Sequence, residues 1–371
     1  MRSTFHLSNL ASVAIALALV GSILFFGYRG WSGAWSALLP PFNKEARPEL
    51  VYSELLGDVT VLWVAMANDP KSRLSLGSVN HQQGYGIRGS VSPDGEIIAY
   101  TVLPPGAADP SSMAALWLLD RAKGQQRMIL EGVDVRGAPV WAPDSARLLV
   151  KSTHPSDQGD TKHQIILVEL ESWDSRGIVT SQGELGFYPI GWAMDGAQIY
   201  YASLTERGTF VNSFDIISQG QRTLFQASPS IARDFHLSTD GAYISYSAEV
   251  SQIGGTALRL MKANADGSSI LDVGAKEGDS FGPAWRPHGG GLTFSTNGRL
   301  IDRGESGSSS SFRALTSESE EGSMVPLAWS PDGRYLAARH LEGVYPLSIT
   351  GESLVVIDAG SGAIQKIEAK G

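Results

Sequence analysis

The sequence predicts an all-β fold that is made of repeated four-stranded units and preceded by one membrane-spanning helix. Three observations predict it: a turn motif recurs six times, β-rich runs follow each copy, and an uncharged apolar stretch lies near the N-terminus. The chain has 371 residues and a formal net charge of -9, and it contains no Cys. A chain of this length holds two or three domains, or one large repeat structure.

The apolar stretch is the first element. Residues 7–26 carry no charge and are mostly Ala, Leu, Val, Ile and Phe. A spanning helix needs about 20 such residues. Aromatic residues cluster from Phe25 to Trp31, where lipid headgroups would lie. We therefore predict a membrane anchor formed by residues 7–28, within an N-terminal segment 1–30.

A cleaved signal peptide is the alternative interpretation of this segment. Small residues of the kind that signal peptidase reads occur at Ser32–Ala34 and Trp35–Ala37. One basic residue, Arg2, precedes the apolar stretch and three follow it before residue 48, a distribution that favours a cytoplasmic C-terminal domain. A single N-terminal apolar segment is nevertheless a common export device, and a chain without Cys suits an oxidising compartment. We therefore expect a single-pass protein with an extracytoplasmic domain, secreted or periplasmic if the segment is cleaved.

The turn motif has the form Trp-Ser-Pro-Asp-Gly and is complete at Trp329–Gly333. Pro presets φ, Asp bonds the local backbone, and Gly tolerates the conformation at the exit of the turn. Successive copies are 44–51 residues apart, which is the period of a four-stranded propeller blade. We interpret the recurring Asp residues as turn formers rather than as a catalytic ring of carboxylates. They are Asp94, Asp144, Asp195, Asp240 and Asp332.

The runs after each motif are the second, third and fourth strands of a blade. After the first motif they are Ile97–Tyr100, Leu116–Leu119 and Arg127–Leu130, which are rich in the apolar residues that strands favour. The fifth unit is reduced in its second half, with Arg299–Ile301 as its third strand and a loop over Gly304–Ser311. The Trp residues that open four of the motifs are predicted to pack between blades. They are Trp141, Trp192, Trp285 and Trp329.

A further, partial unit precedes the first motif. Its β-rich runs Leu50–Tyr52, Val59–Val64 and Arg73–Leu76 correspond to strands two to four. Six units and this partial one predict seven blades, with six blades and an N-terminal extension as the alternative. The first strand of the partial unit must come from elsewhere, and Trp35–Ser36 is a badly spaced candidate. The predicted domains are the N-terminal segment, a linker over 31–48 and a β-propeller over 49–371.

The repeated motif, with its closest copies at Ser92–Tyr100 and Trp329–Ala338, resembles the WD40-like Asp repeats (PD40) of the TolB-type β-propeller family. The resemblance covers about 280 residues. It implies the fold but no activity, because such propellers serve as scaffolds, receptors and accessory domains of enzymes. The α/β domain that precedes the propeller in TolB has no room here, since the apolar segment takes its place. The partners of TolB are therefore not carried over.

One group of side chains has the composition of a metal site. His154, Asp157, Asp160 and His163 offer two imidazoles and two carboxylates within ten residues. Such ligands suit a divalent metal, whereas their setting in a polar loop favours solvated side chains. We regard them as weak metal candidates and expect no cofactor.

Several classes of function are disfavoured by the sequence. The lack of Cys excludes disulfides, thiolate zinc sites and cysteine nucleophiles. The acidic charge without Lys or Arg runs argues against nucleic acid as a partner. Gly84–Gly89 matches a dinucleotide fingerprint in letters only, because a β-turn motif follows it instead of a helix. No Gly-x-Ser-x-Gly elbow is present, and no residue is predicted to be catalytic.

The functional prediction is a membrane-anchored, non-catalytic propeller that binds a protein, peptide or glycan at the cell envelope. A rigid ring with variable loops suits recognition. One alternative is a propeller enzyme, a hydrolase or lyase that acts on a sugar or lactone in the axial funnel. Acids or histidines with shifted pKa values around one mouth would favour that alternative. Another is the sensing domain of a membrane signalling assembly.

Overall fold

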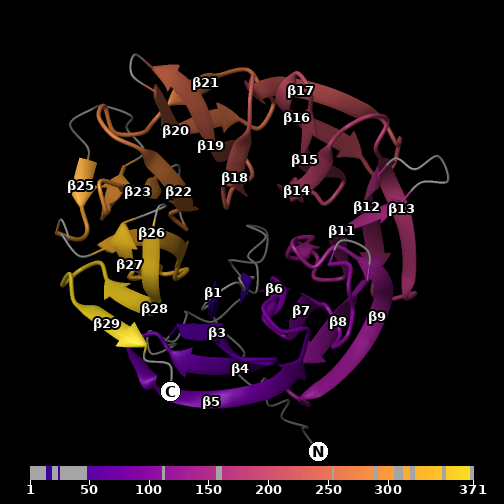
Figure 1. Cartoon of the computed structure of the whole chain (residues 1–371), viewed down its shortest axis with the longest axis horizontal. Coiled ribbons are helices and arrows are strands. Elements are labelled where there is room, and N and C mark those ends of the chain that lie inside the picture. The colour runs from indigo at the N-terminus through magenta and orange to yellow at the C-terminus, as the bar shows by residue number, and fades with distance from the viewer. Residues whose placement is uncertain are drawn as a thin grey trace, which may run out of the picture.

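The chain forms a ring of seven β-sheets around a central opening (Figure 1). The computed structural model contains no helix in the residues that it describes. The predicted seven-bladed all-β propeller is therefore confirmed, and the alternative of six blades is wrong. The described residues are 14–18, 24–25, 48–110, 113–155, 161–252, 255–287, 291–304, 312–317, 322–344 and 348–367.

The first four blades follow one another along the chain. Blade 1 contains β1 (Ala14–Ala18), β3 (Glu49–Leu56), β4 (Val59–Met66) and β5 (Asp69–Asn80). Blade 2 contains β6 (Ile87–Val91), β7 (Ile97–Val102), β8 (Ala114–Asp120) and β9 (Gln125–Val133), with β2 (Leu24–Phe25) beside β6. Blade 3 contains β10 (Val140–Trp141), β11 (Arg147–Pro155), β12 (Thr161–Glu169) and β13 (Asp174–Thr180). Blade 4 contains β14 (Gly186–Trp192), β15 (Gln198–Thr205), β16 (Gly208–Asp215) and β17 (Gln221–Ser228).

The last three blades complete the ring. Blade 5 contains β18 (Ala232–Leu237), β19 (Tyr243–Gln252), β20 (Gly255–Asn264) and β21 (Ile270–Asp272). Blade 6 contains β22 (Ser280–Trp285), β23 (Leu292–Thr296), β24 (Arg299–Arg303) and β25 (Phe312–Ala314). Blade 7 contains β26 (Gly322–Trp329), β27 (Tyr335–Val344), β28 (Ser348–Asp358) and β29 (Ile364–Ile367).

The ring closes where blade 7 meets blade 1. Blade 7 uses four consecutive strands, and the three runs predicted for the partial unit are β3, β4 and β5. The inner position of blade 1 is taken by β1, which pairs parallel to β3. Closure among the described strands therefore depends on packing between complete sheets, without exchange of a strand between blades 7 and 1.

The predicted anchor over residues 7–28 falls largely outside the described residues, which include only β1 and β2 in that range. Trp35–Ser36, the linker candidate for the missing strand, also lies outside them. Within the described part of the chain, no helix is long and apolar enough to cross a membrane. The anchor and the domain boundaries stay predictions.

The recurring Asp residues form the turns between the first and second strands of their blades. Asp94 accepts hydrogen bonds from the Ser92 hydroxyl at 2.6 Å and from the Glu96 backbone N–H at 3.0 Å. Gly95 follows with a φ of 76°, which Gly adopts without strain. The bond to the N–H two residues later recurs at Asp144, Asp195, Asp240 and Asp332.

Replacing one of these carboxylates tests the energetic role of the turn. Asp332→Ala removes bonds to the Ser330 hydroxyl and the Arg334 N–H, so the free energy of unfolding should fall by about 1–3 kcal/mol. Urea unfolding measures the change. Asp174→Ala is the matched control, because that exposed side chain makes no hydrogen bond within the described residues, and it should cost less than about 0.5 kcal/mol. Equal losses in the two variants would show that the turn carboxylate contributes nothing specific.

The core is divided into seven apolar clusters, one at each interface between neighbouring blades. Tyr52 of blade 1 packs with Tyr335 of blade 7, for example, and Leu300 of blade 6 packs with Leu336 of blade 7. Each cluster removes apolar surface from water on two sheets at once. The rigidity of the ring therefore depends on contacts between blades.

The Trp residues of the motif lie at these interfaces, and each indole N–H donates a hydrogen bond to the preceding blade. Trp141 donates to the Ser90 carbonyl at 3.2 Å and Trp192 to the Val140 carbonyl at 3.1 Å. Trp285 donates to the His236 carbonyl at 3.0 Å, and Trp329 to the Thr293 hydroxyl at 3.1 Å. The same side chain therefore ends one strand and fixes the neighbouring blade.

Candidate functional site

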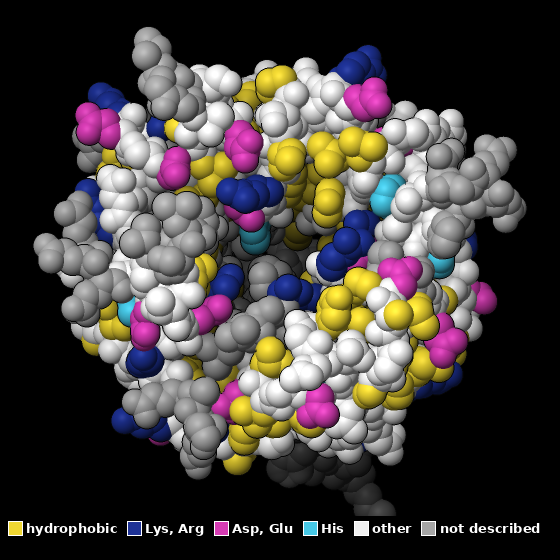
Figure 2. Space-filling view, viewed as in Figure 1, with side chains coloured by type: hydrophobic (Ala, Val, Ile, Leu, Met, Phe, Trp, Pro, Cys, Tyr) yellow, Lys and Arg dark blue, Asp and Glu magenta, His cyan; other side chains and the backbone are white. Residues whose placement is uncertain are grey.

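The first strand of each blade lies toward the central opening, with β2 on the inner side of β6 in blade 2 (Figure 1). In blades 2 to 7 these strands begin at the connections between blades, and in blades 2, 3, 4, 5 and 7 they end at the Asp turns. The connections therefore gather at one end of the opening, which we call the strand-start mouth, and the Asp turns gather at the other. In the face that Figure 2 shows, Lys and Arg side chains stand on several sides of the central opening.

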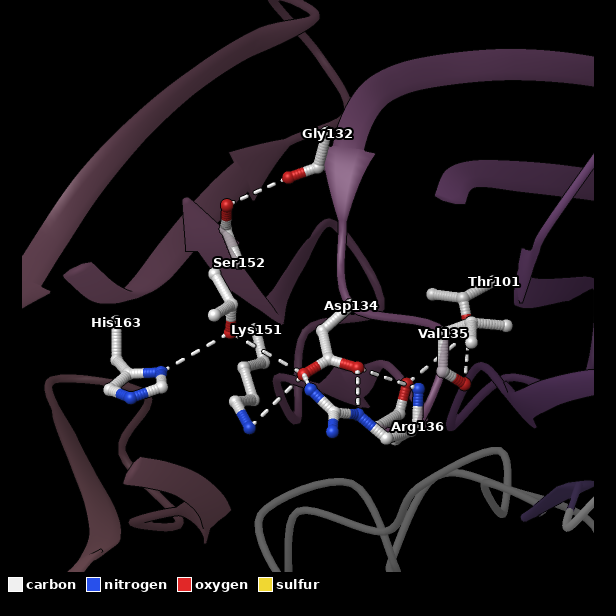
Figure 3. A network of polar contacts seen from close by, with 10 residues as sticks. Thr101, Gly132, Asp134, Val135, Arg136, Lys151, Ser152 and His163 are labelled. Carbon is white, nitrogen blue, oxygen red and sulfur yellow. Dashed lines mark hydrogen bonds and ion pairs between the residues drawn. The ribbon is translucent and has the colours of Figure 1, made fainter. Parts of the chain in front are cut away.

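A buried carboxylate organises one part of the strand-start mouth (Figure 3). Asp134 lies in the connection between β9 and β10 and is 0% exposed. It accepts three hydrogen bonds of 2.9 Å from Arg136, through the backbone N–H, Nε and Nη2. Lys151 Nζ lies 3.1 Å away, and the Thr153 hydroxyl donates at 3.4 Å. With His163, these residues form what we call the Asp134 cluster.

The charge of Asp134 is fixed by these neighbours. Burial alone would raise the pKa of its carboxyl, but the hydrogen bonds from Arg136 and the charge of Lys151 hold that pKa below its usual value. The carboxylate is therefore ionised at neutral pH and saturated with donors.

The two cations of the cluster are held differently. Lys151 is 8% exposed, and its ammonium lies 4.8 Å from the centre of the Tyr188 ring on β14, within the range of a cation–π contact. Arg136 is 59% exposed, and its Nη1 makes no hydrogen bond within the described residues. The cluster thus joins blades 2, 3 and 4 and presents positive charge to the solvent.

His163 is the neutral member of the cluster. It pairs with Thr153 across β11 and β12, and its Nδ1 lies 3.3 Å from the Thr153 hydroxyl oxygen. Burial and the charge of Lys151 hold the pKa of His163 below its ordinary value, although the Asp134 carboxylate acts in the opposite direction. The imidazole is therefore uncharged at neutral pH.

These shifts predict how stability depends on pH. Unfolded His163 takes up a proton below about pH 6.5, whereas the folded side chain resists protonation, so the free energy of unfolding should fall as the pH drops through that region. A second loss should follow as the pH falls below about 3.9 and through the folded-state pKa of Asp134, since that pKa is depressed.

Urea unfolding between about pH 8 and pH 4 checks the first step. His163→Gln should make the free energy of unfolding depend less on pH near pH 6. Some dependence should remain, because burial also lowers the pKa of His236. His154→Gln, on the opposite face of the same strands, is the matched control. An unchanged slope in His163→Gln would contradict the assignment.

The structure places the two His residues of the metal candidates on opposite faces of blade 3. His154 pairs with Lys162, and Thr153 pairs with His163, so alternation along the strands places the two imidazoles on opposite faces of the sheet. His154 contacts the Ser152 hydroxyl. Asp157 and Asp160 lie outside the described residues. Among the described residues, no three His, Asp or Glu side chains are grouped closely enough to hold a metal ion.

A second His and Asp pair lies on β18, next to the opening. Asp234 has a φ of 57°, which is in the left-handed region that non-Gly residues rarely adopt. On β22 of the next blade, Gly282 has a similar φ of 61°. The strand bulges there, between Arg233 and His236. Burial lowers the pKa of His236, whereas the Asp234 carboxylate acts to raise it.

Two hollows lie outside these clusters. The larger has a volume of about 590 Å³ and is lined mainly by apolar side chains of blades 1 and 2, including Tyr100, Met113, Trp117 and Met128. The smaller, of about 410 Å³, lies between blades 4 and 5 and is bounded by Asp215 and Asp266. Neither includes a member of the Asp134 cluster.

Sequence reasoning missed Asp134, Arg136 and Lys151. The only local signal was an Asp and an Arg two residues apart in a connection between blades, just before the motif that begins at Trp141. A connection between the fourth strand of one blade and the first of the next lies at the strand-start mouth. Polar residues there are therefore candidates in any propeller sequence.

Comparisons with known proteins agree with the fold. A prolyl endopeptidase is 13% identical over 86% of this chain, with a TM-score of 0.61, and this chain spans 48% of its length. Oligogalacturonate lyase from Vibrio parahaemolyticus is 11% identical over 86% of this chain and 85% of its own, with a TM-score of 0.55. At these identities the likeness shows the β-propeller fold alone.

The family that the turn motif resembles is also represented. TolB from Acinetobacter baumannii is 13% identical over 99% of this chain and 86% of its own, with a TM-score of 0.49. No protein-family model matches the chain. No curated protein sequence matches it either.

Proposed function

We propose that the chain is a membrane-anchored, non-catalytic binding module that receives a partner at the strand-start mouth, on the extracytoplasmic side of the cell envelope. One observation carries the proposal: the buried Asp134 carboxylate holds Arg136 and Lys151, and the Arg136 guanidinium, which is 59% exposed, offers its charge to solvent. The seven-bladed ring supplies a rigid frame for such a surface.

The accessibility of the Asp134 cluster argues against acid–base catalysis there. A general acid or base must come within hydrogen-bond reach of the substrate. Asp134, Thr153 and His163 are all buried, and the Asp134 carboxylate already contacts the backbone N–H and guanidinium of Arg136, the Thr153 hydroxyl and the Lys151 ammonium. These groups stabilise one another and leave no accessible nucleophile in the cluster.

An enzyme remains the second candidate function because of Asp234 and His236. This pair lies on an inner strand, and the imidazole is held neutral, as a general base must be. Similar solved structures include an oligogalacturonate lyase and prolyl endopeptidases. If the chain cleaves a uronate oligosaccharide or a lactone, His236→Gln should slow turnover by about a hundredfold or more.

The placement at the membrane rests on the uncharged stretch 7–26 and on the aromatic residues that follow it. Protease added to intact cells should digest the propeller if it lies outside the cytoplasm. Protection until the cells are lysed would contradict the proposed side. A sensing role would further require a second membrane protein in contact with this segment.

Site-specific crosslinking tests the binding function. A photo-crosslinking residue at Tyr188, which is 50% exposed at the strand-start mouth, should yield one adduct of defined mass in native membranes. The matched control is Ile217, which is 83% exposed in the turn between β16 and β17 at the opposite end of the same blade. Adducts at both positions, or at neither, would count against recognition at the strand-start mouth.

A further inference from the structure

The cations of the strand-start mouth extend beyond the Asp134 cluster. Arg88 is the second residue of β6 in blade 2, directly before Gly89 and Ser90, with which β2 pairs. The Thr101 hydroxyl lies 3.3 Å from the Arg88 carbonyl oxygen and 3.3 Å from that of Gly137. This contact places β6 beside the connection that carries Arg136.

Among the described residues, no carboxylate forms an ion pair with Arg88. Its guanidinium is half-buried and makes no hydrogen bond or ion pair within the described residues. Burial and the charge of nearby Arg339 lower the pKa of Arg88, whereas Glu352 acts in the opposite direction. Glu352, however, is already bonded to Arg339 on β27.

Together these residues bring positive charges from blades 7, 2 and 3 to one side of the ring, with blade 1 between blades 7 and 2. We call this group the cation arc, and it consists of Arg339, Arg88, Arg136 and Lys151. Two carboxylates are bonded to it, Glu352 and Asp134, and Asp109 lies near Arg136. The arc is therefore net positive in a chain whose formal net charge is -9. A half-buried cation without a partner is unfavourable, and an incoming carboxylate relieves that cost.

We propose that the cation arc binds carboxylate groups of an acidic peptide segment, with Arg88 and the free Nη1 edge of Arg136 as the main donors. This inference rests on the proposed binding function and specifies the chemistry of its partner. Guanidinium groups suit carboxylates because they donate two parallel hydrogen bonds. Acidic side chains spaced along a flexible peptide can reach cations that belong to different blades.

A peptide fits the arc better than an acidic glycan does. Sugar rings are commonly bound by stacking on exposed aromatic faces. The aromatic side chain beside the arc is Tyr188, and the Lys151 ammonium lies over its ring at 4.8 Å. One face of that ring is therefore occupied by a cation of the arc, which leaves less aromatic surface for a sugar to stack on.

Binding of a labelled hexaglutamate peptide to the purified full-length chain tests this inference. We expect saturable binding that weakens as salt is added, since the contacts are ionic. Arg88→Gln should weaken the affinity by about tenfold or more, because it removes a charge-assisted bond. The variant should fold normally, since Arg88 makes no hydrogen bond or ion pair within the described residues, and urea unfolding checks this.

Arg176→Gln is the matched control. Arg176 lies on β13, the outer strand of blade 3, where it is 47% exposed and, among the described residues, makes a single ion pair of 3.9 Å with Glu169. The two variants change the net charge equally, so a loss confined to Arg88→Gln identifies the arc rather than overall charge. Similar losses in both variants would overturn the inference. A neutral hexaglutamine peptide should not bind.

The remaining outcomes separate this inference from the proposed function. If hexaglutamate fails to bind while crosslinking at Tyr188 still yields its adduct, the acidic peptide is wrong and the binding function stands. If hexaglutamate does not bind and crosslinking at Tyr188 yields no adduct, the acidic peptide and the binding function are both wrong. Tighter, Arg88-dependent binding of an oligogalacturonate with the same number of carboxylates would overturn the peptide assignment in favour of a glycan. If millimolar inorganic phosphate displaced the labelled peptide as effectively as unlabelled hexaglutamate does, the arc would be a general anion site. That result would also overturn the peptide assignment.

Discussion

Asp134→Ala is expected to lower the free energy of unfolding by about 3–5 kcal/mol, the range seen when one partner of a buried ion pair is removed. The substitution leaves Lys151, which is 8% exposed, without its counter-charge. It also removes the acceptor for three donors of Arg136 and for the Thr153 hydroxyl. Urea unfolding at neutral pH measures the loss.

Further substitutions separate the effect of the unpaired Lys151 charge from the effect of the side-chain volume lost at Asp134. Lys151→Met in the Asp134→Ala background removes the stranded charge and should restore much of the lost stability, since buried ion pairs are often replaceable by apolar groups. Asp134→Asn keeps the size of the side chain but loses its charge, and should lie between the wild type and Asp134→Ala. A loss below about 1 kcal/mol in Asp134→Ala would contradict the organising role of this carboxylate.

Trp329→Ala is expected to have an effect of similar size, about 3–5 kcal/mol. Trp329 is 7% exposed and packs between blades 6 and 7 with Leu300 and Leu336. The guanidinium of Arg286 lies over its ring at 4.0 Å. Truncation therefore opens a cavity and also removes the hydrogen bond to Thr293.

Further variants separate the two causes of the stability loss, the cavity and the missing hydrogen bond. Trp329→Phe keeps most of the apolar volume but removes the indole N–H, so it should cost about 1–3 kcal/mol. Trp173→Ala is the control, because Trp173 is an exposed side chain whose ring contacts Arg127 at 3.9 Å, and its loss should stay near 1 kcal/mol. If Trp329→Phe were as stable as the wild type, the bond between blades would have no energetic role.

The ring itself was predictable because its signals are local. The turn needs Pro, Asp and Gly at fixed positions, and the hydrogen bonds of Asp94 and Asp332 are completed within two residues on either side. The period between copies then gives the blade size. The source of the first strand in blade 1 was not predictable, because β1 belongs to an apolar run without a turn motif. Apolar content alone does not separate a strand from a helix.

The candidate site depends on contacts that no local pattern encodes. Asp134 and Lys151 are 17 positions apart and meet only because β11 packs beside the connection that precedes β10. His163 was singled out together with His154, but strand alternation separates them and places His163 beside Thr153. The pairing register decides this, and it was unknown from the sequence. Arg88 carried no motif at all.

The Trp bonds between blades divide the ring unequally. Within the described residues they connect blades 2, 3 and 4 through Trp141 and Trp192, and blades 5, 6 and 7 through Trp285 and Trp329. Blade 1 has no Trp bond on either side, and it is held by apolar packing and by an ion pair of 2.7 Å between Glu49 and Arg121 of blade 2. The interfaces of blade 4 with blade 5, of blade 7 with blade 1 and of blade 1 with blade 2 therefore lack a Trp bond among the described residues. Where blades 4 and 5 meet, the Ala232 N–H donates to the Thr209 hydroxyl at 3.0 Å instead. Native-state amide exchange should be fastest in blade 1, which makes it the place where this ring opens first.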